Sequence, residues 1–312
     1  MRRALILYNP SSGRRKHRRE KDIKAVERVL QEGGVQISKE QTASPEEAGE
    51  QARRATTSGY DTVIACGGDG TINDVMQGLV GTETALGVIP LGTANALAHD
   101  LRIPMDLAKA ARALLTAEPR RYTVGRVEFN ALAGGRGSRY FTVAVGIGAD
   151  AHLFYKLDQE LKKRWGMVAY YAKATHVWFT HALGFFDAEF RGELNSEPVP
   201  ARVSELLAVR ISQFGGVLRS FAPGASLSRP DMRLVLFKTN NRLCYLQYIL
   251  RGVLGRGWTV PGIELKNATW VSCRPAQDAN ERVYVEADGE LVGTLPAELS
   301  VVPDALTLLV PQ

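Results

Sequence analysis

A short glycine-rich segment has the residue types and spacing of a phosphate-binding loop. It lies between an apolar run and a segment of helical periodicity, and it reads Gly67, Gly68, Asp69, Gly70 and Thr71. Glycines let the backbone approach phosphate oxygens because no Cβ intervenes, and a helix N-terminus attracts anions. The carboxylate of Asp69 would repel phosphates unless a divalent cation lay between them. The alternative interpretation is a plain glycine-rich turn in which Asp69 caps the helix.

Two further polar loops follow apolar runs in the first third of the chain. One is NPSSG at residues 9–13, and the other is LGTAN at residues 91–95. Each alone is ordinary turn chemistry. Ligands of an open α/β sheet bind at the carboxyl ends of its strands, so three such loops on one sheet would meet at one edge and form a nucleotide site. The sequence contains no GxxxxGK[ST] loop, which argues against a P-loop enzyme.

The elements that must position these loops alternate between strand and helix patterns. Ser44, Pro45 and Glu47 give one helix an N-cap, a proline at its first position and a capping-box glutamate. Short apolar strands that alternate with helices predict a parallel α/β sheet. The expected strands are residues 4–8, 35–39, 62–66 and 86–89, and the expected helices are residues 21–32, 45–58, 72–79 and a helix from residue 94.

The pattern changes near residues 118–121, where short β segments take over. They are expected at residues 122–129, 140–145, 204–211, 234–237, 269–273, 282–286 and 306–310, with one long helical region at 153–181. This change predicts an α/β domain at residues 1–121 and a second, mostly antiparallel domain at residues 122–312. Whether the last strand returns to the first domain is left open.

Composition narrows the class of protein and partner. The chain has 312 residues and a net charge of +6, with a dense basic run from Arg14 to Lys21. This charge favours anionic partners, although a plain solvated surface explains it equally well. The three cysteines, Cys66, Cys244 and Cys273, lack zinc-ligand spacing, and the first residues lack the pattern of a secretory leader. We therefore expect a reducing, cytoplasmic setting.

Six motifs follow one another in a fixed order along nearly the whole chain. They are NPSSG at 9–13, GGDGTIND at 67–74, PLGTANALAHDL at 90–101, VGIGADAH at 145–152, FAPGASL at 221–227 and VEADGE at 285–290. This series resembles the diacylglycerol kinase catalytic domain family, which includes bacterial lipid kinases and is similar to the sphingosine and ceramide kinases. GGDGT alone is shared with NAD kinases and phosphofructokinases, whereas the full series is far more selective.

The resemblance implies a fold, a reaction and a set of site residues. The implied fold is an N-terminal parallel-sheet nucleotide-binding domain like that of NAD and diacylglycerol kinases, followed by a C-terminal, mostly antiparallel β-sandwich. The implied reaction transfers the γ-phosphoryl group of ATP to the hydroxyl of a lipid such as diacylglycerol. The residues that match the ATP site are Asn9, Pro10, Ser11, Ser12, Gly13, Thr42, Gly67, Gly68, Asp69, Gly70, Thr71, Ile72, Asn73, Asp74 and Thr93.

Four acidic residues have roles that the resemblance implies or questions. Asp69 would lie near the phosphates and a magnesium ion (Mg2+), and Glu290 matches the catalytic base of the family. Asp288 is a further candidate metal ligand, although Asp288-Gly289 between two β segments also predicts a hairpin turn. Asp231 alone remains of the Asp-Asp-Gly stretch that binds a structural magnesium in many bacterial members, which argues against that structural site.

The resemblance also implies partners and a location. We expect a lipid substrate, peripheral association with the anionic inner face of the membrane and no nucleic acid, and a homodimer is left open. The basic run at 14–21 and the apolar segment at 167–186 are candidates for lipid contact, although a solvated surface and ordinary packing explain them as well. Lys173, His176 and His181 interrupt the apolar segment, so a membrane span is not expected.

Two other functions stay open at the level of the sequence. One is an NAD kinase-like nucleotide kinase, which shares GGDGT, although IPLGTAN at residues 89–95 is closer to the lipid kinases. The other is a non-catalytic sensor of lipid or nucleotide built on the same fold. The presence of both Asp69 and Glu290 favours a catalyst over a sensor.

Overall fold

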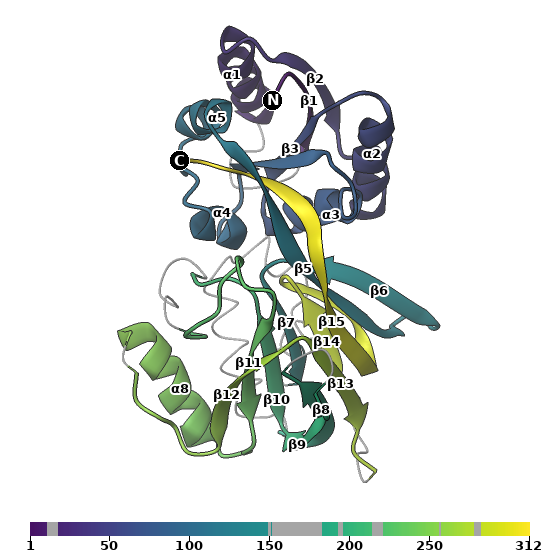
Figure 1. The fold of residues 1–312 in the computed structure, drawn as a ribbon, viewed down its shortest axis with the longest axis vertical. Helices are drawn as coiled ribbons and strands as arrows, with labels where there is room; N and C mark the ends of the chain where they lie inside the picture. The colour runs from purple at the N-terminus through teal and green to yellow at the C-terminus, as the bar shows by residue number, and fades with distance from the viewer. Residues whose placement is uncertain are drawn as a thin grey trace.

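The computed structural model of the chain describes residues 1–10, 18–148, 151, 183–192, 196–213, 221–255, 257–277 and 282–312. Figure 1 shows an N-terminal α/β lobe that carries both chain termini and a C-terminal lobe built mostly of strands. This architecture confirms the predicted fold class, a parallel-sheet domain combined with an antiparallel β domain.

The N-terminal lobe is built on four parallel strands, which lie in the spatial order β2, β1, β3 and β4. Every residue of β3 and β4 is buried, as expected for a parallel sheet covered on both faces. The strands are β1 (Arg3–Tyr8), β2 (Gln36–Gln41), β3 (Thr62–Gly67) and β4 (Ala85–Pro90). All four were predicted, with ends that differ by one or two residues.

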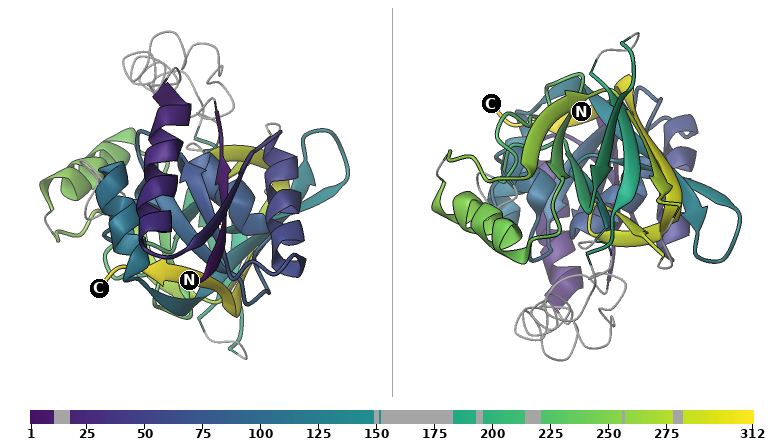
Figure 2. Two further views of the ribbon diagram at one scale, coloured as in Figure 1. Left: turned by 90° about the horizontal axis from the view of Figure 1, so that it is seen from above. Right: turned by 90° about the horizontal axis from the view of Figure 1, so that it is seen from below.

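Helices cover both faces of this sheet. α1 packs with α5 and α2 packs with α3, and Figure 2 places the two pairs on opposite faces. Ser44 Oγ accepts the N–H of Glu47 at 3.2 Å, which confirms the predicted N-cap of α2. The helices are α1 (Arg19–Glu32), α2 (Pro45–Thr57), α3 (Asp69–Gln77), α4 (Ala96–Asp100) and α5 (Leu107–Leu115).

In the part of the chain that the structure describes, the C-terminal lobe consists of antiparallel strands and the helix α8. Its main sheet follows the order β12, β11, β10, β7, β14 and β15, and a second layer is formed by β9, β8 and β13, which pairs with β15. The apolar side chains between these strands form a core cluster of their own. The elements are β5 (Glu118–Ala131), β6 (Arg136–Phe141), β7 (Ala144–Gly148), β8 (Phe186–Arg191), β9 (Val199–Val203), β10 (Glu205–Val209), β11 (Met232–Phe237), α8 (Arg242–Leu254), β12 (Ile263–Ala268), β13 (Trp270–Pro275), β14 (Tyr284–Ala287) and β15 (Glu290–Val310).

Two long strands, β5 and β15, connect the lobes and pair with each other along most of their lengths. The end of β15 lies in the N-terminal lobe, where Leu308 pairs in parallel with Leu86 of β4. Figure 1 shows this yellow strand rising from the lower lobe into the upper one. The last strand therefore joins the first sheet, and the domain boundary at residue 121 stays a prediction.

Some expected elements differ from the observed ones for local reasons. Residues 140–145, expected as one strand, belong to β6 and β7, because the backbone N–H groups between these strands turn toward Asp288. The helix expected from residue 72 begins at Asp69, with Gly68 as its N-cap. The helix expected from residue 94 begins at Ala96, because Asn95 has a left-handed backbone.

Some observed elements were not predicted, and one predicted element lies outside the residues that the structure describes. The sequence did not predict α5, α8, β8, β9 and β12. The expected helical region at 153–181 lies outside the described residues. Among the residues that the structure describes, no helix is long and apolar enough to cross a membrane.

Candidate active site

The carboxyl ends of the four parallel strands carry the predicted nucleotide-site residues. The N–H of Thr42 donates to the end of β1 at 3.0 Å, and the N–H of Asn9 donates to the end of β3 at 3.4 Å. Thr42, Asn9, Gly68 and Thr93 therefore follow β2, β1, β3 and β4 along one edge of the sheet. Ligands of open α/β sheets bind at this kind of edge, so the structure brings together what the spacing of the loops predicts.

Two glycine loops at this edge pack backbone against backbone. A Cβ added to Gly68 would lie 3.2 Å from the Cα of Gly92, and one added to Gly92 would lie 2.6 Å from the Cα of Gly68. Asp69 holds the loops together, since its carboxylate oxygens accept the backbone N–H groups of Asn95 at 2.8 Å and Ala96 at 2.6 Å. The close approach requires glycine at position 92, and Asp69 caps the start of α4.

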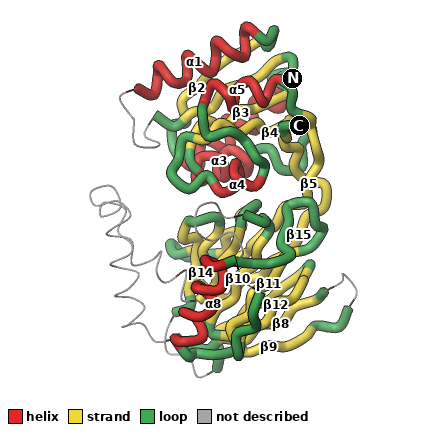
Figure 3. Tube along the Cα trace, turned by 90° about the vertical axis from the view of Figure 1, so that its left-hand side faces the viewer, coloured by secondary structure: helices red, strands yellow, loops and turns green. Residues whose placement is uncertain are grey.

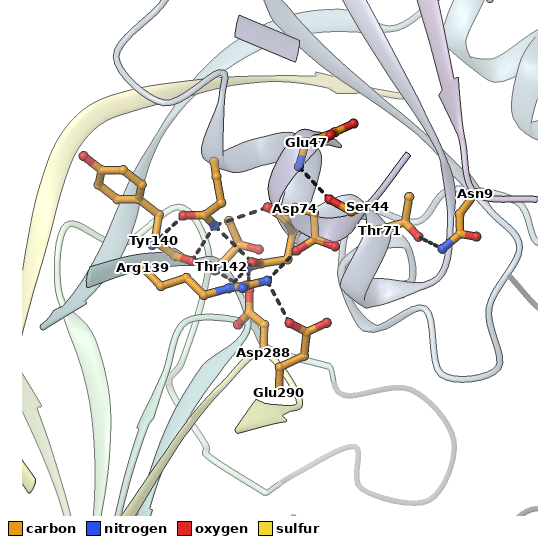
Figure 4. A network of polar contacts seen from close by, with 12 residues as sticks. Asn9, Ser44, Glu47, Thr71, Asp74, Arg139, Tyr140, Thr142, Asp288 and Glu290 are labelled. Carbon is orange, nitrogen blue, oxygen red and sulfur yellow. Dashed lines mark hydrogen bonds and ion pairs between the residues drawn. The ribbon is translucent and has the colours of Figure 1, made fainter. Parts of the chain in front are cut away.

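The start of α3 provides the other wall of the site. Asn9 Nδ2 donates to Thr71 Oγ1 at 3.4 Å, which joins the end of β1 to the first turn of α3 (Figure 4). Ile72, predicted to contact the nucleotide, is 2% exposed and packs into the core, so its side chain does not face the edge. Pro10 is exposed beside Asn9, and Ser11, Ser12 and Gly13 lie outside the described residues.

Asn73 and Asp74, also predicted to line the nucleotide, face the other lobe. Asn73 Nδ2 donates to Asp288 Oδ2 at 2.6 Å, and Asn73 Oδ1 accepts Nε of Arg139 at 2.8 Å. Asp74 Oδ1 accepts Nη2 of the same arginine at 2.6 Å. Figure 4 shows this network joining α3 to β6 and to the turn before β15. Through these contacts the two side chains hold the lobes together.

Asp288 is buried at the centre of the network, with an exposed fraction of 9%. Its φ of 48° and the φ of 84° at Gly289 fit a tight hairpin turn between β14 and β15, as the sequence predicted. Burial raises the pKa of the carboxyl, and four N–H donors act in the opposite direction. Because all four partners donate, these contacts favour the ionised carboxylate. The donors lie at 2.6–3.0 Å and belong to Asn73, Thr142, Val143 and Ala144.

Glu290, the predicted base, lies just beyond this turn at the start of β15. Its side chain is 40% exposed, and its Oε2 lies 2.9 Å from Nη2 of Arg139. A Cβ added to Gly70 would lie 2.6 Å from Oε1 of Glu290. The carboxylate therefore faces the first turn of α3, so that the glycine-rich motif and the acidic residue, far apart in the sequence, border one site.

Arg139 lies between two carboxylates, and this changes the acidity of one of them. Burial, followed by repulsion from Glu290, raises the pKa of Asp74 to about 7, although the ion pair with Arg139 opposes the shift. Near neutral pH Asp74 is therefore partly protonated. When Asp74 is neutral, the charge of Arg139 acts mainly on Glu290.

Comparison with known protein families shows to which family the chain belongs. The profile of the diacylglycerol kinase catalytic domain matches residues 3–127, and that of the YegS C-terminal NAD kinase beta sandwich-like domain matches residues 142–310. The chain belongs to the diacylglycerol kinase catalytic domain family. Membership makes it a phosphotransferase of the lipid kinase type.

Relatives extend along nearly the whole chain. The chain is 29% identical to the diacylglycerol kinase of Bacillus subtilis over 96% of its own length and 93% of that protein. A diacylglycerol kinase structure from Bacillus anthracis has a TM-score of 0.71 at 16% identity and covers 99% of this chain and 97% of its own. Yeast NADH kinase in complex with NADH has a TM-score of 0.52 at 9% identity, with coverage of 100% and 84%. At 16% and 9% identity, these two structures show the shared fold alone.

The magnesium ion that this family implies fits some of the predicted ligands better than others. The oxygens of Asp288 are taken up by four N–H donors, and those of Asp231 accept Nε and Nη2 of Arg229, each at 2.6 Å. The four donors leave no lone pair on Asp288 for a metal, which argues against the expected role of Asp288 as a metal ligand. Asp231 keeps one lone pair on each oxygen, but its charge is paired with Arg229. Each oxygen of Asp69 accepts one N–H and keeps a second lone pair. Within the described ranges no cluster of three His, Cys, Asp or Glu residues could hold a metal by itself.

A single carboxylate such as that of Asp69 would fit a magnesium ion of the kind used by kinases. Such ions keep several waters and are held by one or two carboxylates together with substrate phosphates. The donor set at the sheet edge therefore fits a nucleotide-bound magnesium and does not fit a cage built wholly from protein.

Three residues of this site were missed by sequence reasoning. Arg139 connects Glu290 to Asp74, and its sequence surroundings contain no motif that could have revealed it. Gln77 exchanges hydrogen bonds with the backbone N–H and C=O of Tyr140, both at 2.9 Å. Asn95 has a φ of 50° and closes its own loop through the N–H of Gly92 at 2.9 Å. Its place in LGTAN was the only signal, because asparagine tolerates this left-handed backbone.

The predicted basic run is only partly described, and one of its members is not at the surface. Arg14 to His17 lie outside the described residues. Arg19 begins α1 and is 4% exposed, with Asp22 3.7 Å away. Arg19 therefore does not belong to a solvated basic surface, and a role of the remaining run in lipid contact stays a prediction.

Proposed function

We propose that this kinase transfers the γ-phosphoryl group of ATP to the hydroxyl of a lipid such as diacylglycerol. Family membership and curated relatives named diacylglycerol kinase support this substrate class. The observation that carries the proposal is the position of Glu290, whose Oε1 would lie 2.6 Å from a Cβ at Gly70. A carboxylate opposite a phosphate-binding turn is what a base for an acceptor hydroxyl requires.

The sheet edge would bind the triphosphate. N–H groups in the first turn of a helix have no partner within the helix, so α3 can donate to phosphate oxygens from the N–H of Gly70, aided by its dipole. Asn9 and Thr42 border the same edge. Asp69 would hold a magnesium ion together with the nucleotide phosphates, which neutralises charge that develops on the transferred group.

Glu290 and Arg139 would act on the acceptor side. Glu290 accepts the proton of the lipid hydroxyl through Oε1, the oxygen that faces α3. Oε2 stays paired with Nη2 of Arg139 at 2.9 Å, which fixes the orientation of the carboxylate. Phosphoryl transfer depends mostly on positioning and electrostatics, so Arg139 is a positioning residue in this scheme. The lipid approaches from the membrane, and we propose that the enzyme works at the cytoplasmic face.

A label-transfer assay tests the substrate class. The full chain is incubated with ATP radiolabelled at the γ-phosphate, with magnesium, and with diacylglycerol, ceramide, sphingosine or NAD, and the products are separated by organic extraction. We expect label in the organic phase with a lipid alcohol. Label on NAD would contradict the proposal in favour of a nucleotide kinase, and no transfer to any acceptor would point to a sensor.

The Glu290→Gln variant is the internal control of this assay. It keeps the shape of the side chain but cannot take up a proton, so label transfer should be lost while the melting temperature holds. Transfer that survives in Glu290→Gln would show that the lipid is phosphorylated without this base.

A further inference from the structure

Helix α8 presents an apolar face to solvent. Six of the ten large hydrophobic side chains that are exposed in the described structure belong to this one helix. They are Leu243, Leu246, Ile249, Leu250, Val253 and Leu254, with exposed fractions of 40–66%. Their spacing of three, four and seven residues puts them on one stripe. Scattered exposed leucines are ordinary, but a contiguous apolar stripe marks an interaction surface.

The opposite face of α8 fixes the helix firmly to the lobe. The Tyr245 ring stacks on Phe237 with centroids 4.3 Å apart, and Tyr248 meets the same ring edge-on at 5.4 Å. The Tyr248 hydroxyl donates to the backbone oxygen of Phe221 at 2.6 Å. Asn241 caps the start of the helix, and Gly255 ends it in a left-handed conformation. These contacts of the inner face hold α8 on the lobe, so the outer face is not needed to keep the helix in place.

The charge around α8 indicates its partner. Residues 239–263 contain three basic side chains and no acidic one; the three are Arg242, Arg251 and Arg256. Arg251 is 6% exposed, and Lys238, just before this stretch, is paired with Glu264 at 2.9 Å, so neither adds free positive charge. Two copies of the chain packed through α8 would bring these like charges together. An anionic bilayer complements both features, since interfacial helices bury an apolar face among the acyl chains while nearby cations attract the lipid headgroups.

We propose that α8 is a membrane-docking helix that inserts its outer face into the surface of an anionic bilayer. Figure 1 shows α8 along the outer side of the C-terminal lobe, beside β12, and Figure 3 shows it along the surface of that lobe. Docking there would hold the enzyme on the surface that contains its substrate, so the inference rests on the proposed lipid kinase function. Neither the basic run at residues 14–21 nor the segment at 167–186 is needed for it.

Vesicle flotation of the full chain tests the docking helix directly. The vesicles consist of phosphatidylcholine with or without phosphatidylglycerol. The variants are Leu250→Gln and Leu246→Gln/Leu250→Gln, and the matched control is Leu132→Gln, because Leu132 is 50% exposed and Leu250 is 48% exposed. We expect partition of the double variant onto anionic vesicles to fall about tenfold or more, with Leu132→Gln unchanged. All variants should keep the melting temperature, since the replaced side chains are exposed.

Three results would overturn the proposal. One is equal partition of the double variant and the wild type, and a second is an equal loss in Leu132→Gln. The third comes from light scattering, if the double variant turns a dimer into a monomer while partition onto vesicles is unchanged. The face would then join two copies of the chain.

A water-soluble short-chain diacylglycerol separates failure of this proposal from failure of the proposed function. The double variant should phosphorylate this substrate at the wild-type rate and lose activity only on diacylglycerol presented in anionic vesicles. A wild type that phosphorylates no lipid would remove the proposed function, and flotation would still decide whether α8 docks. A double variant impaired equally on both substrates would contradict a docking role.

Discussion

Gly70 lies so close to Glu290 that adding one methyl group at position 70 should lower activity without lowering stability. A Cβ at position 70 would lie 2.6 Å from Oε1 of Glu290, whereas ordinary contacts begin at 3.4 Å. In Gly70→Ala the carboxylate must therefore retreat by about 0.8 Å. A misplacement of about 1 Å in a catalytic group can cost about 10²-fold, so we expect kcat to fall by roughly 10- to 100-fold.

The same substitution should not weaken the fold. Gly70 lies in the first turn of α3 and is not among the glycines with positive φ. Alanine in a helix interior is favoured over glycine by about 0.5–1 kcal/mol, and less at the end, so the melting temperature should hold or rise slightly. Glu290 can move at low cost because its side chain is 40% exposed. Loss of activity without loss of stability is the expected signature.

Steady-state kinetics and melting curves on one preparation check this expectation. Gly252→Ala in α8 is the matched control, because its added Cβ would meet Phe221 Cδ2 at an ordinary 3.5 Å. Its kcat should stay at the wild-type value. In a Glu290→Gln background, Gly70→Ala should cost little more, because both changes disable the same group. Wild-type kcat in Gly70→Ala, or a rise in KM for ATP alone, would refute the reasoning about Glu290.

Four other predictions follow from the site. Glu290→Gln should lower kcat about 10²- to 10⁴-fold with an unchanged melting temperature, and a kcat within a few-fold of wild type would remove Glu290 from the mechanism. Asp69→Asn should fold with a loss of about 1 kcal/mol, since one of two backbone acceptors remains, and should nearly abolish turnover; near-normal turnover at saturating magnesium would contradict metal binding. Asp288→Asn should lower stability by about 2–3 kcal/mol in denaturant unfolding, because an amide N–H₂ would face buried N–H donors; an unchanged midpoint with lost magnesium dependence would instead favour a metal ligand. Because the pKa of Asp74 is raised to about 7 in the fold, the unfolded chain loses this proton near pH 4 whereas the folded chain keeps it up to about pH 7, so the stability of the fold falls as pH rises over that range. The melting temperature of Asp74→Asn relative to wild type should therefore rise from about pH 4 to about pH 7, and a relative fall would mean that the ion pair with Arg139 dominates.

The N-terminal half of the fold could be predicted because its signals are local. Buried parallel strands such as β3 appear as short apolar runs that end in turn residues, and the Ser44 cap marks the start of α2. α8 was missed for the opposite reason. Its sequence, RLCYLQYILRGVL, is apolar on both the buried and the exposed face, so no amphipathic period stands out.

The site was only half predictable, because its two sides have different origins. The strand-end loops on the nucleotide side are contiguous motifs. Asp288 was expected as a turn and a metal ligand; only the turn could be inferred locally, since the donors that saturate its carboxylate come from residues 142–144 and from Asn73. Arg139 gives no local signal at all, because its role depends on two acids that only the fold brings together.

The eight residues of GGDGTIND combine two functions on one helix. Asp69 and Gly70 belong to the first turn of α3, whereas Asn73 and Asp74 come four residues later, and residues four apart lie on one helix face. The first pair borders the nucleotide edge, and the second pair binds Asp288 and Arg139 of the other lobe. Any change in the position of α3 would therefore move the phosphate-binding turn and the support of Glu290 together. In the proposed mechanism, this coupling would keep Glu290 aligned with the phosphate-binding turn although the two lobes are joined by long strands. It also gives Asn73 and Asp74 a structural role within the motif, namely their contacts with Asp288 and Arg139.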